Sequence, residues 1–148
     1  MSAEEDVRVK VAVYRHFADT AHRPEIADIE ARTGLDHGRI RAALARLRAQ
    51  RLLLLEPDGE TIRMAPPFSG VSTVHQVDVN GISYSANCAW DAFGVVASLQ
   101  QPGRVRSECG QTGEPLEIAV GRDGPEPSSW LFHCLVPAAQ WWSDLVFT

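Results

Sequence analysis

The 148-residue sequence predicts an α+β fold, in which a helical unit over residues 1–66 is packed on a mixed α/β unit over residues 67–148. Apolar residues recur at helical spacing through most of the first 50 residues. Residues 74–136 instead contain short alternating apolar segments separated by turn residues. A hydrophobic content of 45% is enough for a buried core in a chain of this length.

Three helices are expected first. Residues 6–21 carry apolar side chains mostly three and four positions apart, and Pro24 suits the first position of a second helix that ends at Thr33-Gly34. Asp36 can cap a third helix. The inward stripe of that third helix consists of Ile40, Ala43, Leu44 and Leu47.

A small β hairpin is expected to follow the helices. Leu52–Leu55 and Thr61–Met64 read as two strands, and Pro57-Asp58-Gly59 between them is a turn sequence. Three helices followed by such a hairpin form a winged-helix-like pattern.

The winged-helix pattern suggests, as one alternative function, a DNA-binding regulator whose C-terminal half senses a metal or another ligand. Arg39, Arg41 and Arg46 lie on the third expected helix, where a recognition helix would contact phosphate groups. An arginine-bearing helix face is more often only solvated, and a net charge of −5 gives no overall field that attracts nucleic acid or an anionic membrane. A scaffold role for the helical unit is therefore preferred, and nucleic acid is not expected as a partner.

The second unit is expected to begin with a hairpin. Val74–Val79 and Ile82–Ala86 alternate apolar and polar residues around Asn80-Gly81, which is the strongest two-residue hairpin signal. Two further strands are expected over 104–109 and 116–120. The hairpin leads directly into the segment that carries the most chemistry.

That segment is a cysteine and a carboxylate at the start of a predicted helix. Asn87 is a preferred N-cap residue, and an apolar helical run follows over residues 88–99. Cys88 then falls in the first turn, where free N–H groups and the helix dipole are expected to lower the pKa of its thiol. Asp91, three residues on, lies on the same face. The alternative reading is a buried structural cysteine beside an aspartate that only favours the first turn.

Several separated motifs resemble the organomercurial (alkylmercury) lyase family, and the resemblance runs from about residue 25 to the C-terminus. The motifs are Arg63-Met-Ala-Pro-Pro-Phe-Ser69, Val71-Ser-Thr-Val74, Asn87-Cys-Ala-Trp-Asp91, Cys109-Gly-Gln-Thr-Gly-Glu-Pro115 and Trp141-Trp-Ser-Asp-Leu-Val-Phe-Thr148. Their order and spacing make the match more specific than any one motif alone.

The resemblance implies protonolysis of a carbon–mercury bond. Cys88 and Asp91 match the family's active-site cysteine and aspartate, so Cys88 is expected to bind the substrate mercury as a thiolate and Asp91 to carry the proton. The family has a second active-site cysteine, expected just beyond a segment like residues 141–148, where this sequence ends. Without it, the chain would fit a family member that performs acid/base chemistry on another organic substrate, with Asp91 as the key group.

The remaining cysteines are expected to pack in the core. Cys109 ends a predicted strand, and Cys134 lies in the apolar segment 130–136, also expected to be a strand. Cys134 could supply a second sulfur if the fold brings it to Cys88. Three widely spaced cysteines fit neither a disulfide framework nor a Cys-x-x-Cys metal site.

The sequence also suggests the cellular compartment of the protein and its binding partners. No run approaches the roughly 18 apolar residues of a membrane span, and the acidic start, Met-Ser-Ala-Glu-Glu-Asp, is unlike a signal peptide. A reducing cytoplasm is expected, because free thiols persist there. We expect a small-molecule substrate, no membrane and no cofactor.

Overall fold

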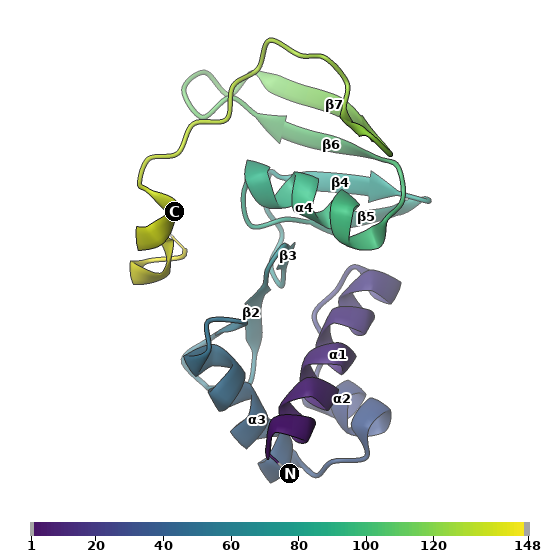
Figure 1. The fold of residues 1–148 in the computed structure, drawn as a ribbon, viewed down its shortest axis with the longest axis vertical. Helices are drawn as coiled ribbons and strands as arrows, with labels where there is room; N and C mark the ends of the chain where they lie inside the picture. The colour runs from purple at the N-terminus through teal and green to yellow at the C-terminus, as the bar shows by residue number, and fades with distance from the viewer. Residues whose placement is uncertain (1, 147–148) are drawn as a thin grey trace.

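The computed structural model describes residues 2–146 and confirms the α+β class (Figure 1). Three helices come first, and a three-stranded antiparallel sheet in the order β1-β2-β3 follows them. The elements are α1 (Ser2–Thr20), α2 (Ile26–Thr33), α3 (His37–Ala49), β1 (Leu54–Leu55), β2 (Ile62–Ala65) and β3 (Phe68–Ser69). Asp36 caps α3 as predicted, whereas α2 begins at Ile26 with Glu25 as its cap and Pro24 outside the helix.

A five-stranded antiparallel sheet, in the order β5-β4-β6-β7-β8, forms the second half. Its elements are β4 (Gln76–Val79), β5 (Ile82–Ser85), β6 (Gly103–Glu108), β7 (Pro115–Gly121) and β8 (Gly124–Pro125), with α4 (Ala89–Leu99) between β5 and β6. The hairpin at Asn80-Gly81 is confirmed, and both residues have positive φ, 49° and 80°. α4 packs on β4 and β6 and so covers one face of this sheet (Figure 1).

Phe68 joins the helical half of the chain to the second sheet. Its ring stacks on Phe17 of α1 at a centroid distance of 5.5 Å and lies 5.8 Å from the ring of Tyr84 on β5. Phe68 is 2% exposed, and one continuous buried cluster runs from α1 to α4 and β7. The start of α4 is therefore fixed against both halves of the chain.

Residues 126–146 leave β8 and pass the N-terminal end of α4, where Phe132 contacts Trp90. They then reach the 3-10 helix η1 (Ala138–Ser143), which lies apart from α4 (Figure 1). The prediction of a strand over 130–136 is wrong, because this segment pairs with no strand. Its apolar residues Leu131 and Leu135 are 91% and 70% exposed. A run of apolar residues was thus not sufficient for a strand here, because the segment lies outside both sheets.

No helix within residues 2–146 is long and apolar enough to cross a membrane.

Candidate active site

The start of α4 is built around Cys88, which is the N-cap residue of the helix. Its backbone is extended (φ −151°, ψ 176°), and its Sγ accepts the backbone N–H of Asp91 at 3.4 Å. The prediction that Asn87 is the N-cap is therefore wrong by one residue. The side chain of Asn87 is turned toward other acceptors, so the sulfur of the following residue takes the capping role.

Asn87 connects the cap to the preceding loop and to the carboxylate. Its Nδ2 lies 3.0 Å from Oδ2 of Asp91, 3.2 Å from the carbonyl oxygen of Phe68 and 3.3 Å from that of Pro67. Because Asp91 is one turn along α4, this contact holds its side chain back toward the first turn. This role of Asn87 is not evident from the sequence, because Asn at the start of a helix is most often the N-cap residue.

Asp91 is half-buried, and burial raises the pKa of its carboxyl, an effect that the hydrogen bond from Asn87 partly offsets. The charge of Asp91 also affects Tyr14 of α1. Burial, and to a smaller extent the negative charge of Asp91, raise the pKa of the Tyr14 phenol to about 12. The hydroxyl of Tyr14 donates to the carbonyl of Pro66 at 3.0 Å. A carboxyl in these surroundings can hold a proton closer to neutral pH than a solvated aspartate can.

The environment of Cys88 differs from the sequence expectation. Burial raises the pKa of its thiol, and hydrogen bonds from the backbone N–H groups of Asp91 and Trp90 only partly oppose this. The predicted lowering of this pKa is therefore wrong. The first turn supplies the expected N–H groups, but loss of solvent and the nearby Asp91 charge outweigh them.

Cys134 is the second thiol near the start of α4. A charge on Cys134 contributes to the raised pKa of Cys88, and the ring of Phe132 lies 5.6 Å, centroid to centroid, from that of Trp90. The two aromatic residues are each two positions from one of the cysteines. Cys134 is exposed, so the expectation of a buried core thiol is wrong.

Cys109 lies at the turn between β6 and β7. It is half-buried, and hydrogen bonds from Thr112 and from the backbone of Gln111 lower the pKa of its thiol. The expectation that Cys109 only packs thus misses these turn contacts. Signals for them were present in the sequence, because Gly110–Pro115 reads as a tight turn.

The three arginines of the DNA-binding alternative all contact acidic residues. Arg39 donates from Nε to Glu5 at 3.0 Å, and Arg46 donates from Nε to Asp6 at 2.9 Å. Nη1 of Arg41 lies 3.4 Å from the carboxylate of Glu60. These contacts favour a packing role for the arginines, since much of their charge is compensated by α1 and by the turn before β2.

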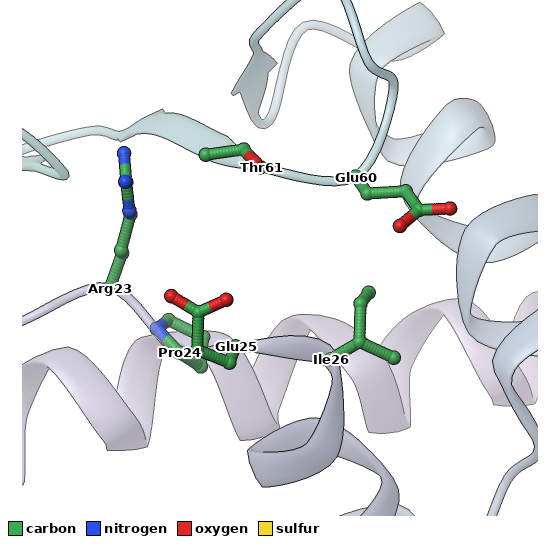
Figure 2. A pocket seen from close by; sticks show the side chains of 6 residues that line it. All are labelled: Arg23, Pro24, Glu25, Ile26, Glu60 and Thr61. Carbon is green, nitrogen blue, oxygen red and sulfur yellow. The ribbon is translucent and has the colours of Figure 1, made fainter.

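Two surface hollows lie outside the cluster around Cys88. One, between the start of α2 and the turn before β2, is lined by Arg23, Pro24, Glu25, Ile26, Glu60 and Thr61 (Figure 2). The other is lined by residues that follow α1 and by residues of β3, the loop after it, β4 and β5, four of which are serines: Ser69, Ser72, Ser83 and Ser85. Neither contains Cys88 or Asp91, and residues 2–146 contain no group of three or more His, Cys, Asp or Glu placed to hold a metal ion.

Comparison with known proteins agrees with the resemblance seen in the sequence. The sequence model of the MerB family, alkylmercury lyase, matches residues 68–148, which is more than half of the chain. The matched region includes Cys88, Asp91 and Cys134. The chain therefore belongs to the alkylmercury lyase family.

Among solved structures, the crystal structure of the mercury-bound form of MerB2 is similar, with a TM-score of 0.65 and 19% sequence identity. The alignment covers 85% of this chain and 60% of that chain, so this chain spans less than two thirds of the length of MerB2. No curated protein sequence matches. At this identity the likeness establishes the fold.

Proposed function

We propose that the protein cleaves the carbon–mercury bond of an organomercurial, with Cys88 as the thiolate that captures mercury and Asp91 as the proton donor. The observation that carries this proposal is that both residues lie on one turn of a helix. Cys88 Sγ is 3.4 Å from the backbone nitrogen of Asp91, and the pKa of the Asp91 carboxyl is raised. Membership of the alkylmercury lyase family supports the substrate class.

Each group has a defined role in the reaction. The Cys88 thiol loses its proton to solvent, and the resulting thiolate displaces the counter-ligand X of the organomercurial R–Hg–X. An S–Hg bond forms as the Hg–X bond breaks, because mercury binds soft sulfur more tightly than oxygen. The carbon–mercury bond then breaks, and its electron pair takes the proton of Asp91 to give the hydrocarbon R–H. Hg²⁺ stays on sulfur until a solution thiol removes it, and the Asp91 carboxylate regains a proton from solvent.

Cys134 is our candidate for a second sulfur ligand. A second thiolate would add electron density to mercury and so weaken the carbon–mercury bond. The electrostatic interaction of Cys134 with Cys88 and the contact between Trp90 and Phe132 support this assignment. The position of Cys134 on a segment without regular structure allows it to approach a metal bound at Cys88.

The test measures binding and cleavage separately. Ethylmercury binding is followed by native mass spectrometry and ethane release by gas chromatography, with excess free thiol present. Cys88→Ser should abolish tight binding, whereas Asp91→Asn should bind one equivalent and release little ethane. Cys109→Ser is the matched control, because Cys109 belongs to the turn between β6 and β7 and not to the start of α4. This variant should behave as wild type. Absence of ethane release by the wild-type chain would refute the proposal.

A second candidate is acid/base chemistry on another organic substrate, again with Asp91 as the key group. The observation that favours it is that burial alone raises the pKa of Asp91, with no need for a metal. Under this alternative, Asp91→Asn abolishes activity while Cys88→Ser is partly tolerated. The same pair of variants therefore distinguishes the two functions.

A further inference from the structure

The side chain of Asn87 makes all its polar contacts through nitrogen. Its Nδ2 faces Oδ2 of Asp91 at 3.0 Å and the carbonyl oxygens of Phe68 and Pro67 at 3.2 and 3.3 Å. Its Oδ1 is buried and has no hydrogen-bond partner among the described residues. Asn87 is thus held in place although its own acceptor is unsatisfied, an arrangement that usually has a reason.

The two backbone carbonyls determine which way the amide faces. If the amide were rotated by half a turn, Oδ1 would face the carbonyl oxygens of Pro67 and Phe68, neither of which has a hydrogen to donate. The observed orientation is therefore the one that the backbone imposes. This backbone is itself well fixed, because Phe68 is buried against α1 and β5 and a Cβ on Gly94 of α4 would lie 3.1 Å from Pro67.

We propose that Asn87 is a positioning residue that makes the two oxygens of Asp91 unequal. Its N–H group donates to Oδ2, so that a proton on the carboxyl is carried by the other oxygen, Oδ1. Without this hydrogen bond, the carboxyl can rotate and present either oxygen. The inference rests on the proposed function, in which this proton goes to the departing carbon.

The activity test compares a substitution of Asn87 with a substitution of Thr73, which hydrogen-bonds to the residue before Asn87. Asn87→Leu removes the donor to Asp91 and keeps a side chain of similar size. Thr73→Val is the matched control, because Thr73 Oγ1 donates to the carbonyl of Ala86 at 2.6 Å and so supports the residue before Asn87 without contacting Asp91. Asn87→Leu should bind ethylmercury within about twofold of wild type but release ethane about 10- to 100-fold more slowly. Thr73→Val should retain both properties.

A spectroscopic test of the positioning needs no turnover. In ¹⁵N-labelled wild-type protein, the side-chain amide resonance of Asn87 should shift on Asp91→Ala and stay in place on Thr73→Val. This measurement also decides the inference if Asn87→Leu fails to fold. If the wild-type chain releases no ethane, the proposed function fails while the resonance still reports on the positioning. An unmoved Asn87 resonance in Asp91→Ala, or wild-type ethane release by folded Asn87→Leu, would overturn the inference.

Discussion

The ring of Trp90, in the first turn of α4, lies against the ring of Phe132, with 5.6 Å between their centroids. Trp90 is 59% exposed and Phe132 45% exposed, so the contact lies at the surface and is the described ring contact between the C-terminal segment and α4. An aromatic pair of this kind contributes roughly 0.5–1.5 kcal/mol. That energy is enough to bias where Cys134 lies, but it leaves the segment free to adjust to a ligand.

The first prediction concerns this contact. Phe132→Ala should weaken the hold on the segment that carries Cys134, so that bound Hg²⁺ exchanges faster to a competing thiol while capture of ethylmercury by Cys88 persists. Cys134→Ser should have the same effect, and more strongly, because it removes the sulfur itself. Release of Hg²⁺ to glutathione, followed by stopped-flow, measures both. Unchanged release in Cys134→Ser would show that Cys134 is not a ligand.

The second prediction ranks the thiols by their reactivity. Turn hydrogen bonds lower the pKa of Cys109, whereas burial raises that of Cys88, so Cys109 holds the larger thiolate fraction at neutral pH. Iodoacetamide should therefore label Cys109 before Cys88 at pH 7, contrary to the order expected from a helix N-terminus alone. Peptide mass spectrometry over a pH series gives both rates. Faster labelling of Cys88 would mean that the first turn outweighs burial.

The local signals at Asn80-Gly81 and Asp36 are confirmed, whereas the sequence did not reveal the contacts between distant segments. Asn80-Gly81 adopts the hairpin because its two positive-φ positions are decided by those two residues alone. Asp36 caps α3 for an equally local reason. The shift of the α4 cap from Asn87 to Cys88 depends on carbonyls about twenty positions earlier, which no local pattern reveals.

Burial explains the other differences at the site. The sequence predicts Cys88 and Asp91 on one helix turn, and the structure has them there. The direction of the shift in the Cys88 pKa, however, depends on how much solvent the folded chain excludes from the thiol. Cys134 shows the converse, because an apolar segment was read as core and instead lies on the surface. Solvent exclusion is a property of the assembled fold.

The third prediction concerns the contact between the two halves of the chain. Phe68→Ala removes a ring that stacks on Phe17 and lies beside Tyr84, and it should lower the free energy of unfolding by roughly 3–5 kcal/mol. Val74→Ala, at a residue that is 50% exposed, should change it by about 0.5 kcal/mol or less. Urea denaturation of both variants measures the difference. Similar losses in the two variants would contradict the role of Phe68 as the joint.

The fourth prediction concerns the arginines of α3. Asp6 is 8% exposed and bonds to Arg46, so Arg46→Met leaves a buried carboxylate without that donor and should lower the stability of the fold. Arg41→Met should cost about 0.5 kcal/mol or less, because Arg41 pairs with Glu60 at the surface. Adding Asp6→Asn to Arg46→Met should recover part of the loss. Equal costs for the two arginine variants would contradict this packing role of Arg46.

The fifth prediction links Asp91 to stability. Burial raises the pKa of Asp91 in the folded state, so across the pH interval between its unfolded and folded pKa values the folded protein binds more protons than the unfolded chain. Stability from this group is therefore full below that interval and falls as the pH rises through it. Asp91→Asn removes the charge and keeps an acceptor for Asn87, so it should raise the Tm at pH 7 by a few degrees.

The Tm difference between Asp91→Asn and wild type should shrink as the solution is made acidic, because the wild-type carboxyl is then neutral as well. Asp123→Asn is the control, since Asp123 is exposed and its substitution should leave the pH dependence of Tm unchanged. Calorimetry of the three proteins from pH 3 to pH 8 measures the trend. A Tm difference between Asp91→Asn and wild type that stays constant with pH would show that packing, and not a buried charge, sets the stability at this position. Asp91 would then lack the environment that a proton donor requires.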